Sequence, residues 1–158
     1  MSGFLDPFRG EQTGWKDGRS VWTTLTPLRY ESDYLVHGTI MVPKEFITDL
    51  ASVPRLPLVW LAVGGRGIRS AVIHDFAYQF GFWWMLDQGR WVRSDVVRTI
   101  VDYVFWESLL ADPLSGAGRM RALEMWAGVR AGGRGIWSDA ARRGALNPMW
   151  TAGPWEAP

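Results

Sequence analysis

Short runs rich in β-branched and aromatic residues alternate with turn residues over the first third of the chain, a pattern typical of strands. The runs cover residues 21–25, 28–30, 34–36 and 39–42. Turn residues at 31–33 and at His37-Gly38 separate them, and Pro43 ends the last run. The pattern predicts an antiparallel meander.

Downstream, apolar residues recur at helical spacing. Ser70 stands where an N-cap is expected, and Val72, Phe76 and Phe80 follow at intervals of four, which predicts a helix over residues 71–82. Ser94 is a second N-cap candidate, and it opens a predicted helix that reaches about Leu110. Asp112-Pro113 ends that helix.

A third helix is predicted over residues 119–130, with Met120, Leu123, Trp126 and Ala127 on its buried face. Strands first and helices afterwards indicate an α+β fold, in which a small antiparallel sheet packs against about three helices. We expect an N-terminal arm over 1–19, one domain over 20–133, and an irregular tail rich in Trp, Gly and Pro over 134–158.

Composition narrows the possible chemistry. The 158 residues include no cysteine, which excludes disulfides, thiolate catalysis and cysteine-type zinc sites, so any metal site would be rich in oxygen ligands. The net charge of +1 gives no reason to expect a nucleic-acid partner. No apolar run is long enough to span a membrane, and residues 1–18 do not form a secretory signal, so we expect synthesis in a bacterial cytoplasm.

Tryptophan is in surplus. There are eleven, and four of them, Trp126, Trp137, Trp150 and Trp155, fall in the last third of the chain. Tryptophan is costly to leave in water and is enriched at interaction anchors. We therefore expect the tail to bind other proteins or a second copy of the chain.

Polar residues that can carry chemistry stand in two clusters inside apolar sequence, with one more acid downstream. They are Asp49, Ser52 and Arg55 in the first cluster, His74, Asp75 and Tyr78 in the second, and Asp95 at the predicted start of the next helix. His74 and Tyr78 are four apart and share a helix face. Since strand ends and helix starts converge at one mouth of a layered domain, we expect Asp49, His74, Asp75 and Asp95 to meet.

Two chemistries fit that expectation. Asp49, His74, Asp75 and Asp95 would be the ligands of a divalent cation that activates water. Alternatively, His74 would act as a general base oriented by a carboxylate, for instance on the hydroxyl of Ser52.

Each residue also has a purely structural interpretation. The helix dipole explains an acid at position 95. Asp49 with Ser52 reads as a capping turn before Pro54, and His74 as a core histidine bonded to a backbone carbonyl. Arg55 would pair with an aspartate, and the hydroxyl of Tyr78 would join the same network.

Four segments resemble a known family, the domain of unknown function 1353, which occurs mainly in bacteriophage and prophage genomes. They are Val42–Arg55, Ala71–Tyr78, Arg93–Asp95 and, more loosely, Met125–Arg130, within a resemblance that spans about Leu25 to Gly133. Glu45 stands where the family pattern leads us to expect glycine, and we expect this departure to alter the turn after Pro43. The resemblance implies that Asp49, Ser52, Arg55, His74, Asp75, Tyr78 and Asp95 occupy motif positions, but it implies no reaction.

Two functions follow as hypotheses. In the first, the chain is a structural or assembly component of a phage particle, at the tail or tail tip, in which the polar cluster stabilises the domain. In the second, it is a metal-dependent hydrolase of cell-wall or phosphoester material that uses Asp49, His74, Asp75 and Asp95.

Overall fold

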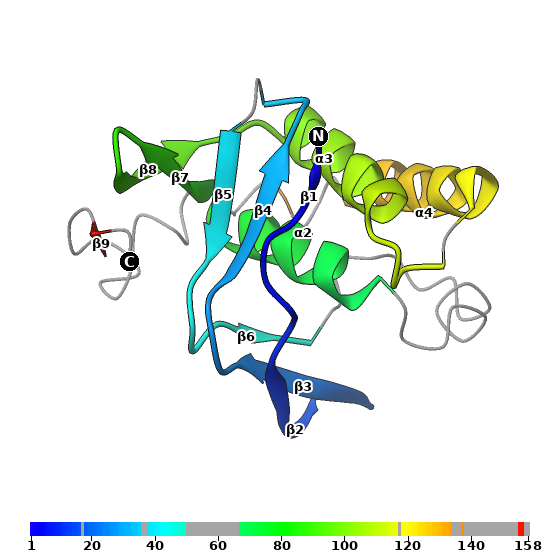
Figure 1. Ribbon diagram of the computed structural model, residues 1–158. Coiled ribbons are helices and arrows are strands. Elements are labelled where there is room, and N and C mark those ends of the chain that lie inside the picture. Colours follow the sequence, from blue (N-terminus) through cyan, green and yellow to red (C-terminus); the bar gives the residue numbers. More distant parts are fainter. Residues whose placement is uncertain are drawn as a thin grey trace.

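The fold combines two antiparallel sheets with a layer of helices, as the computed structural model shows (Figure 1). The structure describes residues 1–16, 18–35, 38–49, 67–116, 118–133, 137 and 155–156. Leu50, Ala51, Ser52 and Arg55, as well as His37 and most of the tail beyond Gly133, lie outside the described residues. The predicted α+β class is confirmed.

The larger sheet has six strands in the order β1-β4-β5-β7-β8-β9, and every neighbouring pair is antiparallel. The strands are β1 (Gly3–Phe4), β4 (Leu28–Ser32), β5 (Gly38–Val42), β7 (Phe82–Asp87), β8 (Arg90–Asp95) and β9 (Trp155–Glu156). The predicted strands at 28–30 and 39–42 correspond to β4 and β5. The predicted run at 34–36 is not a strand in its described part, because Tyr34 and Leu35 form the turn between them.

The smaller sheet consists of β2 (Gly10–Lys16), β3 (Arg19–Thr24) and β6 (Ile47–Thr48), in that order. It lies at the lower end of the molecule in Figure 1, away from α4. Residues 1–19, which we expected to form an arm, therefore contribute β1 and β2 to the two sheets.

The helices are α2 (Ile68–Phe80), α3 (Arg98–Ala111) and α4 (Arg119–Gly132). α2 packs against β5, β6 and β7 as well as against α3, while α3 also contacts β1 and β4, and α4 packs on α3. Because α2 has neighbours on several sides, nearly all of its residues are buried, including the predicted core positions Val72, Phe76 and Phe80. No helix in the described part of the chain is long and apolar enough to cross a membrane.

Both predicted helix starts are wrong. α2 begins two residues before Ser70, with Gly67 in the left-handed region (φ 83°) as its N-cap, and the Ser70 hydroxyl makes no cap. Residues 82–95 form the hairpin of β7 and β8, so Ser94 belongs to a strand and α3 starts only at Arg98. The hairpin turn at Gln88-Gly89 has positive φ at both residues, the geometry that continues the twist of paired strands.

The buried face of α4 also differs from the prediction. Met120 is 70% exposed and Leu123 is 46% exposed, whereas Ala122, Met125 and Val129 are buried against α3. Both sets repeat at helical spacing, so the packing against α3 selects the face that periodicity leaves ambiguous.

The turn after β5 contains the residue that departs from the family pattern. Glu45 adopts a φ of 66°, in the left-handed region where glycine is favoured, and its backbone N–H donates to Thr24 O at 2.7 Å. The Thr24 hydroxyl donates to Pro43 O and accepts from the Phe46 N–H. Two strand ends thus hold Glu45 in a conformation that a Cβ atom disfavours.

Candidate functional site

Asp102, on α3, is the centre of the buried polar network, and it is not among the residues that the sequence pattern indicated. Its Oδ1 accepts hydrogen bonds from the Tyr78 hydroxyl at 2.6 Å and from His74 Nε2 at 3.2 Å. Its Oδ2 accepts from Arg130 Nη1 at 3.0 Å and lies 3.4 Å from Arg98 Nε. We call these five residues the Asp102 network.

The network joins three helices. His74 and Tyr78 are one turn apart on α2, and their rings stack with centroids 4.1 Å apart. Arg98 and Asp102 are one turn apart on α3, and Arg130 comes from the last turn of α4. The network therefore fixes how α2, α3 and α4 sit against one another.

Arg98 also binds the carbonyl groups at the C-terminal end of α4. Its Nη2 donates to the backbone carbonyls of Val129 and Arg130, and its Nε donates to the Tyr78 hydroxyl at 3.2 Å. The last carbonyls of a helix have no partner within it and carry partial negative charge, so a guanidinium stabilises them. Next to them, Gly133 leaves room for the phenol: a Cβ there would lie 2.5 Å from the Tyr78 oxygen.

Burial and hydrogen bonding together set the protonation states of the network. His74, Tyr78 and Asp102 have no exposed surface. Burial lowers the pKa of His74 and outweighs the opposing effect of Asp102, so the ring is neutral at neutral pH. Burial alone would raise the pKa of Asp102, but the hydrogen bonds from His74 and Tyr78 outweigh it and the net pKa is lowered.

These protonation states assign the hydrogen atoms. An ionised carboxylate can only accept hydrogen bonds, so neutral His74 carries its proton on Nε2. This Nε2–H group donates a hydrogen bond to Asp102. Burial, followed by the hydrogen bond to Asp102, raises the pKa of Tyr78, so the phenol stays protonated and donates as well. A histidine oriented by a carboxylate is the geometry of a catalytic dyad, but here the imidazole has no surface that a substrate atom can touch.

Asp75 is buried on the same helix but belongs to a different contact. The Thr48 hydroxyl at the end of β6 donates to Asp75 Oδ2 at 2.5 Å. Asp49, the next residue, is half-buried. The expected convergence of the last strand end with α2 therefore exists at Thr48 and Asp75, which attaches the smaller sheet to the helix layer.

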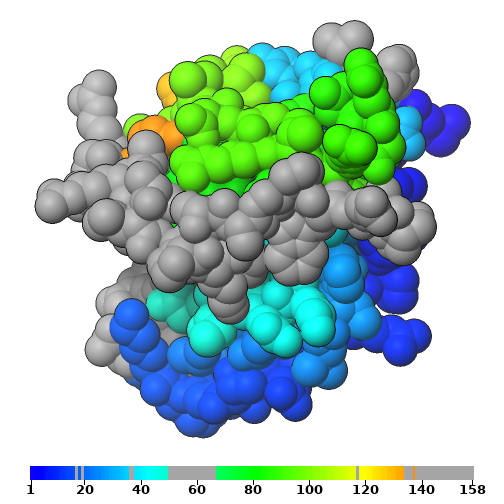
Figure 2. All heavy atoms as spheres, turned by 90° about the vertical axis from the view of Figure 1, so that its left-hand side faces the viewer, coloured from blue at the N-terminus to red at the C-terminus, as the bar shows by residue number. Residues whose placement is uncertain are grey.

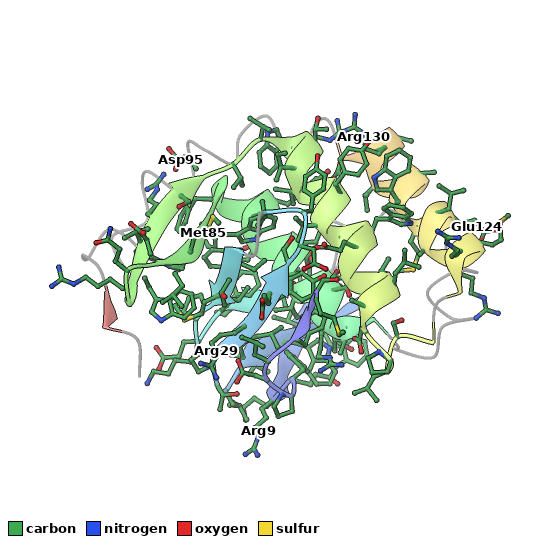
Figure 3. The ribbon with its side chains drawn as sticks, turned by 45° about the horizontal axis from the view of Figure 1, so that its top comes forward. Arg9, Arg29, Met85, Asp95, Glu124 and Arg130 are labelled. Carbon is green, nitrogen blue, oxygen red and sulfur yellow. The ribbon has the colours of Figure 1, made fainter. Side chains whose placement is uncertain are left out.

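Asp95 does not join the buried residues. It ends β8, its side chain is 78% exposed, and it pairs with Arg93 at 3.0 Å. In Figure 3 Asp95 lies beside β8 and apart from Arg130, which lies at the end of α4 and is a member of the Asp102 network. The helix-start explanation for Asp95 is also wrong, because the residue is in a strand.

A divalent-cation site built from the predicted ligands is not assembled in the described part of the chain. Asp49, His74, Asp75 and Asp95 are all described, and no three His, Asp or Glu side chains within the described ranges gather closely enough to hold a metal ion. The predicted ligand set is therefore divided between the network, the Thr48 contact and the surface. Ser52 and Arg55 lie outside the described residues.

Glu107 makes a second link between α3 and the larger sheet. Its carboxylate accepts from the Tyr30 hydroxyl at 3.1 Å, the Ser32 hydroxyl at 2.7 Å and the Tyr34 N–H at 3.0 Å. Like the Asp102 network, this cluster satisfies a carboxylate with donors from elements distant in sequence.

An open hollow of about 480 Å³ lies between the N-terminal segment and the start of α2. Its lining combines the apolar side chains of Phe4, Phe8 and Leu114 with the ion pair of Arg69 and Asp112. Among the described residues, none of the candidate site residues that the sequence pattern indicated lines this hollow.

Comparison with protein families gives a match over most of the chain. Residues 22–129 match the family described as "Protein of unknown function (DUF1353)". The match includes the end of β3, all of β4 to β8, α2 and α3, and most of α4, together with every member of the Asp102 network except Arg130. Neither the curated proteins nor the solved structures give a match.

Proposed function

The chain belongs to the DUF1353 family, and we propose that it is a structural or assembly component of a bacteriophage particle, at the tail or tail tip. The observation that carries the proposal is the burial of the Asp102 network. Its imidazole and carboxylate are fully buried, and their hydrogen bonds join three helices. Such a network serves the rigidity and specificity of a fold.

The phage assignment rests on the resemblance of the motifs to phage and prophage proteins. Under this proposal the chain is made in the cytoplasm of the bacterial host and is then built into the particle. Its partners are other particle proteins or further copies of itself. Exposed apolar side chains on the described surface, Trp15, Ile47, Leu114 and Met120, are compatible with such contacts.

A hydrolase is the second candidate, and the hydrogen bond between His74 and Asp102 is the observation that favours it. Catalysis would require the imidazole to become accessible and a nucleophile or water to reach it. The Asp95 side chain is 78% exposed whereas His74 is fully buried, which argues against Asp95 as a fourth metal ligand beside His74. We therefore rank this candidate below the structural role.

The direct test is the protein content of purified particles. Particles from the induced or infected host are banded on a density gradient and analysed by mass spectrometry. The structural proposal expects this chain at a constant ratio to the other particle proteins. Its absence from banded particles, while it is abundant in the lysate, would refute the proposal; the same chain expressed without phage is the control for adhesion to the gradient fraction.

Substitution of Asp75 by Asn separates the two candidates. In a structural contact, the change weakens the bond from Thr48 and lowers the melting temperature. In a catalytic role, it would leave the melting temperature nearly unchanged and abolish hydrolysis of cell-wall or phosphoester substrates. Asp87→Asn, at an exposed acid at the end of β7, is the matched control.

A further inference from the structure

The outer edge of β2 is a candidate surface for binding a partner strand. β2 is an end strand of the smaller sheet, and among the described residues it pairs with β3 alone. Glu11, Gln12, Thr13, Trp15 and Lys16 are exposed, and Trp15 is 73% exposed. Figure 2 shows residues from the N-terminal part of the chain, in blue, at the lower end of the molecular surface in that view. An unpaired strand edge is a template for another strand.

The register between β2 and β3 assigns each β2 side chain to a face of the sheet. Glu11 lies opposite Thr23, and Lys16 lies opposite position 19. Positions 19 and 23 are four apart on β3 and share a face, so Glu11 and Lys16 share it too. Gln12 and Trp15 lie opposite Trp22 and Ser20, which puts them together on the other face.

This arrangement depends on the bulge in β2. Glu11 and Lys16 are five apart, so in a regular strand they would point to opposite faces. The register shifts between Gln12 and Gly14, and the extra residue brings both charges to one face. The strand therefore carries an acid near one end and a base near the other on the same face.

We propose that β2 pairs antiparallel with β2 of a second copy of this chain. A two-fold axis between Thr13 and Gly14 places Glu11 of each copy opposite Lys16 of the other. The same register places Gln12 opposite Trp15 on the second face, so every opposed pair shares a face. The two bulges meet at the axis, where two residues oppose two.

The charges are the reason to assign a second copy and no other strand. Directly opposed side chains of unlike charge stabilise an antiparallel pair, and like charges destabilise it. A complementary antiparallel partner needs a base opposite Glu11 and an acid opposite Lys16. A second copy of β2, running antiparallel, supplies both. β2 also precedes the segment matched by the family, so this contact belongs to residues outside the match. The β2–β2 contact would let copies of the chain assemble within a particle, so its biological meaning rests on the proposed particle role.

The test is the oligomeric state of the full chain by sedimentation velocity over a wide range of concentration. The expected result is a dimer in equilibrium with monomer. Glu11→Lys should raise the dissociation constant about tenfold or more, because each dimer then contains two Lys–Lys contacts. Lys16→Glu should do the same through two Glu–Glu contacts.

The double reversal, Glu11→Lys with Lys16→Glu, restores unlike pairs and should return the dissociation constant to near the original value. Glu124→Lys, at an exposed acid on α4, is the control and should leave it unchanged. A chain that stays monomeric at every concentration overturns the proposal. A dimer that ignores both single reversals, or that the double reversal does not rescue, overturns it as well. Either result leaves the particle assay unaffected, so the two proposals fail separately.

Discussion

Replacing Asp102 by Asn tests the central physical argument, that a buried carboxylate holds three helices together. Asn keeps the shape of the side chain and removes its charge. If the amide oxygen continues to accept from His74 and Tyr78, the amide nitrogen faces the guanidinium groups of Arg98 and Arg130, and donors then oppose donors.

The expected cost follows from the burial of the partners. Removing one member of a buried ion pair costs about 3–5 kcal/mol. The Arg130 side chain is 38% exposed and can turn to water, so we expect the lower value, about 3 kcal/mol. In a chain of this size that loss lowers the melting temperature by roughly 6–12 °C.

The free energy of unfolding is measured by urea titration, followed by tryptophan fluorescence and by far-ultraviolet circular dichroism. Asp95→Asn, at a carboxylate that is 78% exposed, is the control and should change the free energy by less than about 0.5 kcal/mol. A loss below about 1 kcal/mol for Asp102→Asn, or equal losses for the two variants, would refute the assignment of Asp102 as the centre of the network.

Three further changes test other features of the structure. Glu45→Gly should raise the free energy of unfolding by about 0.5–1 kcal/mol, because glycine tolerates a φ of 66°. Lys44→Gly, at the neighbouring position, should lower the free energy of unfolding. Both variants are measured by urea titration, and a lower free energy of unfolding in both would exclude backbone strain at Glu45. The lowered pKa of His74 predicts that stability is fully present above the unfolded-state value of 6.5 and falls as the solution is acidified below it, because the unfolded chain takes up a proton that the folded chain refuses. The fall should be at most about 1.4 kcal/mol per pH unit and should be smaller in His74→Gln when titrations at about pH 7.5 and about pH 5 are compared; an equal pH dependence in the two proteins would contradict the shift. Gly133→Ala should cost about 2 kcal/mol, because its Cβ would lie 2.5 Å from the phenol oxygen. Gly3→Ala, with open space around the added Cβ, should change stability by less than about 0.5 kcal/mol, and similar losses for the two variants in thermal melts would argue against the close approach.

Local pattern was sufficient for the class of the fold and for the core of α2. The spacing of Val72, Phe76 and Phe80 predicts a helix face, and the structure buries all three side chains. The placement of His74 and Asp75 inside apolar sequence predicts burial with partners, and both residues are buried in hydrogen-bonded contacts. Periodicity and burial are properties that neighbouring residues share, so they can be read along the chain.

A signal for Asp102 is present in the sequence. It is a charged residue three positions before Phe105 and seven before Leu109, both of them core residues, and four after Arg98. An acid on the apolar face of a helix needs a partner. The prediction selected Asp95 because Ser94 resembles an N-cap, although Gln88-Gly89 between two apolar runs is a hairpin signal.

What the residues along the chain determined by themselves is the set of elements and the requirement that certain polar groups be buried with partners. The tertiary structure alone decided which partners they find: Asp102 for His74, Thr48 for Asp75, and the surface for Asp95. The physical reason is that hydrogen bonds between elements depend on how the helices and sheets pack. That packing is determined by the total apolar surface that the whole domain buries. No window of sequence contains that sum.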